Sequence, residues 1–205
     1  MTESTKTPEQ ELHRQKMQAH KEKVDAHIAA ANIERGVAIL LTGNGKGKTS
    51  SAFGMVLRAL GYDQKIGIVQ FLKGVQDCGE ADFIRAHCPK VEFHQMGSGF
   101  TWNSQDKDSD IRAAQAVWQY AEVMLSDPSF DLVVLDELTY MFAYKYLDRA
   151  TMIDAIQNRP REQTVVVTGR GGGRELREIM DTISEVKDIR HAYQAGIKAR
   201  KGVDY

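Results

Sequence analysis

Residues 37–54 read "VAILLTGNGKGKTSSAFG", and this stretch decides the fold. Its continuous apolar run, 37–42, predicts a buried strand, and apolar residues then recur at helical spacing from Thr49 until Gly61 stops the helix. Three glycines and two lysines lie between the two elements. A strand, a glycine-rich loop and a helix in this order are the context that a phosphate-binding loop requires.

The loop fits the general pattern G-x-x-x-x-G-K-[ST] at its end, and Thr42 stands where the first glycine is expected. The physical basis for phosphate binding does not depend on that first glycine. The other glycines let the backbone wrap around an anion, and the first helical turn offers free N–H groups. Lys48 would reach the terminal phosphates. The alternative is a glycine-rich turn with incidental lysines. The predicted nucleotide contacts in this region are Gly43, Asn44, Gly45, Lys46, Gly47, Lys48, Thr49 and Ser50.

A pair of carboxylates follows another buried strand, "DLVVLDE" (131–137). At the carboxyl end of a parallel strand, Asp136 and Glu137 would lie beside the phosphate loop. Together with the Thr49 hydroxyl they predict a site for Mg²⁺, with Mn²⁺ as the alternative ion, and which carboxylate holds the metal stays open. The other interpretation is an acidic pair that caps the next helix, although adjacent carboxylates repel unless a cation is near.

Short apolar runs alternate with helical stretches through the rest of the chain. This alternation predicts an α/β fold with a mainly parallel sheet flanked by helices. Further strands are expected at 65–71, 91–96, 131–137 and 164–169, with a last candidate at 186–193. Helices are expected at 111–125, 138–147, 151–157 and 175–183.

The first 35 residues differ in composition from the remainder of the chain. They are rich in Lys, Glu, Gln, His and Ala, and no proline or glycine interrupts them between Glu9 and Arg35. This composition favours a helix with little apolar surface to bury. We therefore expect an N-terminal helical extension, residues 1–35, and one α/β nucleotide-binding domain, residues 36–205.

Composition restricts the function classes. The 205 residues carry a formal net charge of −1, which argues against a nucleic-acid partner. No apolar run approaches the roughly 20 residues that span a bilayer, and the polar start is unlike a signal peptide. We expect a cytoplasmic protein with no membrane partner. Cys78 and Cys88 are expected to be reduced thiols, with a disulfide as the alternative.

Two further loops have open interpretations at the level of their residues. In "QMGSGFTWNSQ" (95–105), Phe100 and Trp102 either anchor the loop to the core or contact a flat ligand, and the neighbouring Met96 is more typical of a core. In "TGRGGGRE" (168–175), the two arginines either contact phosphate or substrate carboxylates or belong to a solvated turn. They are Arg170 and Arg174.

Five motifs occur in one order: "TGNGKGKT", "GFTW", "VVLDELTYM", "TGR" and "HAYQAGIKARKGVDY". Together they resemble the corrinoid adenosyltransferases of the cob(I)alamin type, bacterial phosphate-loop enzymes of vitamin B12 metabolism. The resemblance runs from about Gln15 to Tyr205, and the family shares the Thr42 departure. It implies a RecA-like P-loop NTPase fold.

The resemblance also implies a reaction. The family transfers the 5′-deoxyadenosyl group of ATP to the Co(I) centre of a reduced corrinoid and releases triphosphate, in adenosylcobalamin biosynthesis or salvage. Glu137 and Arg170 would join the loop in binding ATP, and Lys48 would act in catalysis. Met96, Phe100 and Trp102 would contact the corrinoid, and the latter two would act in catalysis by displacing its lower axial ligand.

The implied partners are a cobalamin- or cobinamide-type corrinoid, a reduced electron-transfer protein such as a flavodoxin, and a second copy of the chain. In the resulting homodimer the N-terminal helix would cover the active site of the other subunit. Two alternatives remain beside this resemblance. One is a small kinase or ATPase that produces ADP, and the other is a nucleotide-dependent module acting on DNA or a protein.

Overall fold

The computed structural model describes residues 7–72, 79–97 and 106–204. Its sheet has six strands in the order β3-β2-β4-β5-β1-β6, and every neighbouring pair is parallel. The predicted α/β class is thus confirmed, with a sheet that is parallel throughout. The strands are β1 Ala38–Thr42, β2 Ile66–Gln70, β3 Val91–Gln95, β4 Leu132–Asp136, β5 Thr164–Thr168 and β6 Thr182–Glu185.

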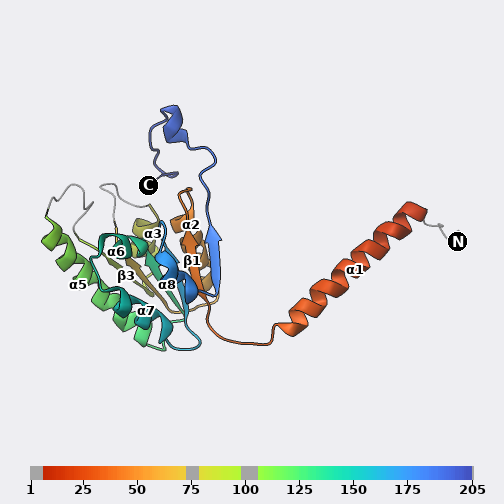
Figure 1. The fold of residues 1–205 in the computed structure, drawn as a ribbon, viewed down its shortest axis with the longest axis horizontal. Coiled ribbons are helices and arrows are strands. Elements are labelled where there is room, and N and C mark those ends of the chain that lie inside the picture. The colour runs from red at the N-terminus through yellow and green to blue at the C-terminus, as the bar shows by residue number, and fades with distance from the viewer. Residues whose placement is uncertain (1–6, 73–78, 98–105, 205) are drawn as a thin grey trace. The chain divides into compact units, whose positions relative to one another are not determined.

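Helices cover both faces of the sheet (Figure 1). On one face, α2 and α3 bury Phe53, Val56 and Ile84 against alternate residues of the central strands. On the other face, α5 to α8 pack around a larger core that includes Trp118 and Met141. The helices of this part are α2 Lys48–Leu60, α3 Gly79–His87, α5 Lys107–Ser126, α6 Thr139–Tyr144, α7 Arg149–Gln157 and α8 Gly173–Glu178, with the 3-10 turn η1 Ala192–Ala195.

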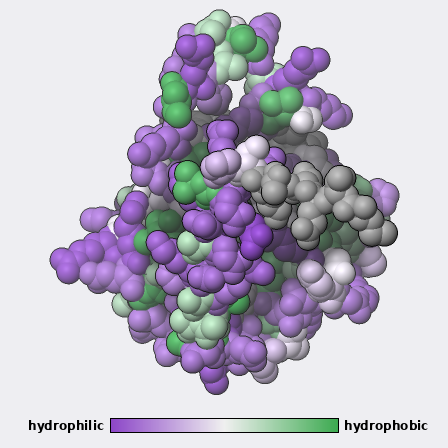
Figure 2. Space-filling model, turned by 90° about the vertical axis from the view of Figure 1, so that its right-hand side faces the viewer, coloured by the Kyte–Doolittle hydropathy of each residue, from purple (hydrophilic) through white to green (hydrophobic). Residues whose placement is uncertain are grey.

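The chain separates into two compact units, residues 1–34 and 35–205. The described part of the first unit, residues 7–34, contains the helix α1 (Pro8–Ala30). Thr7 and Gln10 form a reciprocal capping box at its start. None of its residues is buried, as the composition predicts for this stretch. Among the described residues, no helix is both long and apolar enough to cross a membrane. Hydrophilic residues predominate on the face drawn in Figure 2.

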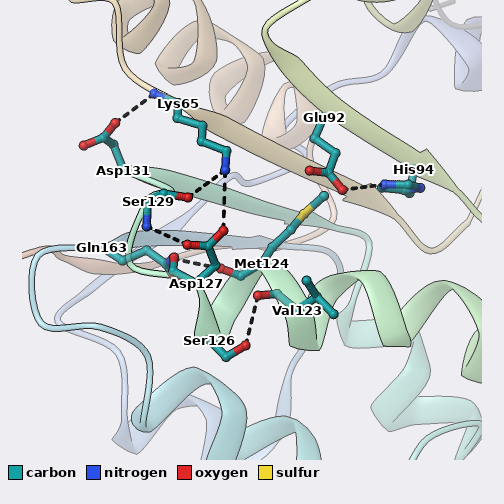
Figure 3. A network of polar contacts seen from close by, with 10 residues as sticks. All are labelled: Lys65, Glu92, His94, Val123, Met124, Ser126, Asp127, Ser129, Asp131 and Gln163. Atoms are coloured by element: carbon teal, nitrogen blue, oxygen red, sulfur yellow. Dashed lines mark hydrogen bonds and ion pairs between the residues drawn. The ribbon is translucent and has the colours of Figure 1, made fainter.

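A polar network fixes the amino ends of the central strands (Figure 3). The backbone N–H of Lys65 donates to Asp131, and its ammonium group donates to Ser129 and lies 3.9 Å from the centre of the Phe130 ring. The amide of Gln163 donates to the backbone carbonyl of Met124 at 2.9 Å. These contacts join the residues that directly precede β2, β4 and β5. They lie at the amino ends of these strands, and the phosphate loop lies at the carboxyl ends.

The end of the domain differs from the prediction. The expected last strand at 186–193 is wrong, and so is the end of the expected helix at 175–183, because α8 ends at Glu178 and β6 occupies Thr182–Glu185. All four residues of β6 are exposed on the edge of the sheet, so it lacks the apolar run that marks the buried strands. Sequence patterns also gave no sign of α3.

The cysteines are consistent with reduced thiols as far as the structure describes them. Cys88 is a free, half-buried thiol, and Cys78 lies outside the described residues.

Candidate functional site

A cavity of about 1150 Å³ opens at the carboxyl ends of the strands. Its polar side contains the phosphate loop and the residues that follow β4 and β5, and its apolar side is formed by α2 and α3. The polar lining includes residues 44–50 together with Gln70, Asp136, Glu137, Tyr140 and Arg170. The apolar lining includes Phe53, Val56, Leu57, Leu60, Phe83 and Ile84. Seven of the eight residues predicted from the loop therefore line one cavity, and Gly43 does not.

The phosphate loop has the backbone that its glycines allow. Gly43 and Gly47 have φ angles of 102° and 120°, in the left-handed region that favours glycine. Helix α2 begins at Lys48, and no side chain caps its first turn. Its free N–H groups and the positive end of its dipole are thus left for an anion. The N–H of Gly45, in contrast, donates to the carbonyl of Val186 at 2.8 Å and does not point to the cavity as a free donor.

Two lysines of the loop have different surroundings. The ammonium group of Lys48 is buried and donates to the carbonyl of Gly45 at 2.9 Å. Burial lowers the pKa of Lys48, and the nearby Glu137 carboxylate opposes that shift. Lys46 is exposed and forms an ion pair of 3.0 Å with Asp204, near the end of the chain. The loop therefore offers one buried cation and one surface cation.

Both carboxylate oxygens of Asp136 accept hydrogen bonds from side chains. Oδ1 accepts from the hydroxyls of Thr49 at 3.0 Å and Thr168 at 2.6 Å. Oδ2 accepts from the amide of Gln70 at 3.0 Å. Burial raises the pKa of Asp136, and these three donors act in the opposite direction. Asp136 is therefore a buried acceptor that orients its neighbours, foremost the Thr49 hydroxyl.

Glu137 is held differently from its neighbour. Its φ angle is 60°, and its Oε2 is buried without a hydrogen-bond partner among the described residues. Burial, and next the charge of Asp136, raise the pKa of Glu137 to about 7, against the opposing charges of Lys48 and Arg170. An unpaired buried oxygen is costly unless a ligand or ion completes it. Glu137 thus lines the cavity with a carboxylate whose Oε2 is buried and unpaired.

These contacts fit a magnesium ion. The Thr49 hydroxyl donates a hydrogen bond to Asp136, so its lone pairs are left for a cation, and the Glu137 carboxylate lines the same cavity. Within the described ranges, no three His, Cys, Asp or Glu side chains form a metal cluster. Mg²⁺ usually takes one or two carboxylates and completes its shell with phosphate oxygens and water.

Of the two predicted arginines, Arg170 lines the cavity. Arg174 is largely exposed and pairs with Glu178 on the surface of α8 at 2.6 Å. Met96 follows β3 and is buried in the core with 3% of its surface exposed. Phe100 and Trp102 lie outside the described residues. The corrinoid contacts predicted for Met96, Phe100 and Trp102 therefore stay predictions.

Sequence reasoning missed Gln70, Thr168 and Tyr140. Gln70 and Thr168 each end an apolar run, "KIGIVQ" and "TVVVT", as Asp136 does. A polar residue at the carboxyl end of a buried parallel strand was the signal that could have found them. No polar residue at the end of an apolar run marks residues 191–204, so their place in the cavity lining could not be predicted in this way.

A family model described as "ATP:corrinoid adenosyltransferase BtuR/CobO/CobP" matches residues 34–205. The chain belongs to this family. The resemblance drawn from its motifs is thereby confirmed, and membership of the ATP:corrinoid adenosyltransferase family makes the chain an enzyme of the transferase class. No comparison supports the kinase or ATPase alternative.

The curated relatives of this adenosyltransferase family match nearly end to end. The chain is 50% identical over 195 residues to the corrinoid adenosyltransferase of Escherichia coli (strain K12), covering 95% of this chain and 98% of the relative. It is 48% identical to that of Salmonella typhimurium over the same shares. For the corrinoid adenosyltransferase of Pseudomonas aeruginosa the identity is 49%, over 94% of this chain and 95% of the relative.

Proposed function

We propose that this cavity binds ATP with its triphosphate in the loop 43–50 and transfers the 5′-deoxyadenosyl group to the Co(I) centre of a reduced corrinoid. One observation carries the proposal. The uncapped start of α2 and the buried carboxylate of Glu137 line a single cavity. Its volume of about 1150 Å³ exceeds the roughly 300–1000 Å³ of an ordinary small-molecule site, which suits two substrates.

The transfer balances as a displacement at carbon. The electron pair of Co(I) forms the bond to C5′ of the ribose, the C5′–O bond breaks, and its electrons leave on the triphosphate. Cobalt is formally oxidised by two electrons, and no proton moves, so no general base is needed. The protein must stabilise the negative charge that develops on the leaving oxygen. We assign this role to Lys48, Lys46 and the N–H groups at the start of α2, which line the cavity.

The metal site of this proposal assigns separate roles to the two carboxylates. Glu137 and Thr49 would hold Mg²⁺, which would neutralise charge on the triphosphate. Asp136 would act through the Thr49 hydroxyl, because its own oxygens already accept three hydrogen bonds. Mn²⁺ prefers the same oxygen ligands and is the alternative ion. Arg170, on the same polar side of the cavity as the loop, would contact the phosphates as well.

We extend the proposal to the parts that the family resemblance suggests. Met96, Phe100 and Trp102 would contact the corrinoid, and removal of its lower axial ligand by the two aromatic residues would ease reduction to Co(I). A reduced flavodoxin-like protein would supply the electron. The enzyme would act in the cytoplasm as a homodimer in which residues 1–35 of one subunit cover the site of the other. A helix without any buried residue of its own supports that last role.

Product analysis tests the proposal. The protein is incubated without oxygen with Mg-ATP and chemically reduced cobalamin, and the phosphate product and corrinoid spectrum are recorded. We expect triphosphate together with a light-sensitive alkyl-cobalt spectrum. ADP with an unchanged corrinoid would mean that the loop performs phosphoryl transfer, and the proposal would be wrong.

A further inference from the structure

The end of the chain packs directly on the phosphate loop. We call residues 186–204 the C-terminal segment. Besides accepting the N–H of Gly45, Val186 donates its own N–H to the carbonyl of Thr42 at 2.8 Å. A Cβ atom on Gly43 would overlap the Val186 carbonyl, and one on Gly45 would lie 2.6 Å from the carbonyl oxygen of Lys187. The loop glycines are therefore needed for this close approach as well as for an anion.

The C-terminal segment continues into the wall of the cavity. It leaves the tip of β6 and folds back toward the loop between β1 and α2 (Figure 1). His191, Gly202, Val203 and Asp204 line the same cavity as the phosphate loop. The segment is thus part of the proposed triphosphate site.

Asp204 is held in place by a closed turn. Its Oδ2 accepts the N–H of Arg200 at 2.8 Å, and its own N–H donates to the carbonyl of Arg200 at 2.8 Å. The turn aims the carboxylate at Lys46, 3.0 Å away. Both side chains are partly exposed, at 44% for Lys46 and 27% for Asp204. An ion pair so exposed contributes little stability of its own, so it opens at small cost.

A triphosphate and the Asp204 carboxylate need the same cation. Lys46 is paired with Asp204, although it belongs to the loop that the proposed function assigns to the triphosphate. Free triphosphate is highly charged, and the start of α2 with two lysines would hold it firmly after the transfer. Product release often limits the turnover of enzymes. A carboxylate that recaptures Lys46 would favour release.

We propose that Asp204 is a positioning residue that holds Lys46 through their ion pair and competes with triphosphate for it, and so promotes release of the product. The inference rests on the proposed function, because it requires triphosphate in the loop. It assigns to the C-terminal segment a part in turnover that is separate from adenosyl transfer itself.

Calorimetric titration of the full chain with sodium tripolyphosphate, in the absence of corrinoid, tests the inference. Asp204→Asn is nearly isosteric and keeps an oxygen to accept the N–H of Arg200. We expect D204N to bind tripolyphosphate about 3- to 10-fold more tightly, a gain of about 0.7–1.4 kcal/mol. In steady state, the inhibition constant of tripolyphosphate and the KM for ATP should fall by similar factors, and D204E should restore wild-type values.

Two controls make the test specific. Asp63→Asn removes a carboxylate that pairs with Lys90 at 2.6 Å and does not line the cavity, so it should change nothing. In a Lys46→Ala background, D204N should lose its effect, since the competition has no cation left. Unchanged or weaker binding by D204N, or an equal gain in both backgrounds, overturns the inference alone. A wild-type protein that binds no tripolyphosphate overturns the proposed phosphate site, and the inference with it.

Discussion

The hydroxyl of Thr49, one residue into α2, donates a hydrogen bond of 3.0 Å to Oδ1 of Asp136, the last residue of β4. This bond joins the phosphate loop to the central strand and leaves the oxygen lone pairs of Thr49 for a cation. It also explains why an acidic residue is buried at the end of an otherwise apolar strand.

Thr49→Val should remove the bond and the cation ligand while keeping the shape of the side chain. We expect Mg²⁺-dependent ATP binding to weaken about 10- to 100-fold, the range found when groups around a metal are lost. A fluorescent ATP analogue titrated at varied Mg²⁺ concentrations measures this. Thr49→Ser keeps the hydroxyl and should stay within a few-fold of wild type. Equal losses in both variants would contradict the role of the hydroxyl.

Glu137 should make the stability of the metal-free protein depend on pH. Its folded-state pKa of about 7 lies above the usual value of 4.5, so the folded state retains the proton longer than the unfolded state does. The resulting stability is fully present below about pH 4.5 and is lost as the pH rises through about 7. The shift corresponds to a loss on the order of 3 kcal/mol.

Urea unfolding at several pH values between 5 and 8, without nucleotide or Mg²⁺, measures this dependence. Glu137→Gln stays uncharged throughout and should flatten the profile, so that the variant exceeds wild-type stability at pH 8. Identical slopes in the two proteins would show that another group carries the dependence.

Gly169→Ala should destabilise the protein by more than about 2 kcal/mol, the scale of an overlap that the packed core cannot relieve. The backbone there has a φ of 135°, and the added Cβ would overlap the Thr139 hydroxyl and lie 3.1 Å from Oε2 of Glu137. Gly54→Ala is the control, because it lies in the interior of α2 with open space around the new methyl group. Thermal unfolding should show G54A gaining about 0.5–1 kcal/mol. A stable G169A would contradict the crowding described.

Trp102→Ala should spare ATP binding and strongly slow adenosylation of cobalamin, following the family resemblance. If the aromatic loop acts by removing the axial ligand, the defect should be larger when the assay starts from Co(II) with a reductant than from pre-reduced Co(I). Both rates are followed by the corrinoid spectrum. Normal turnover from Co(II) would refute the proposed role of the loop.

Deletion of residues 1–30 should weaken corrinoid affinity while the domain keeps its melting temperature. Helix α1 buries none of its residues, and the anchor of the next unit, the ion pair of Arg35 with Asp181, is retained. Asp181 also accepts the N–H of Ala38 at 2.8 Å, at the start of β1. Unchanged corrinoid affinity in the shortened protein would rule out a covering role for the extension.

The sequence predicts the parts of this fold whose cause is local. Buried strands such as "VAILLT" and "DLVVLDE" have continuous apolar runs, and the phosphate loop has glycines at the positions that need them. Strand β6 was not predicted, because an exposed edge strand has no continuous apolar run. Its pairing with β1 also depends on residues about 140 positions away in the sequence.

The site shows the same division. Lys48, Thr49 and the acidic pair follow from a motif and its spacing. Asp136 accepts three hydrogen bonds, whereas Glu137 keeps an unpaired oxygen. This difference depends on side chains from three other strands or helices. Distant contacts of this kind, like that of Asp204 with Lys46, have no period or spacing in the sequence that would predict them.

The position of β1 in the sheet has a consequence for synthesis. Its two neighbours are β5 and β6, and Ala38 pairs with Val165, roughly 125 residues later in the chain. Ribosomes add about 5–20 residues per second, so the apolar strand before the phosphate loop waits roughly 6–25 seconds for its first partner. During that time it is exposed to aggregation and to chaperones. The nucleotide site is among the last parts of a newly made chain to form.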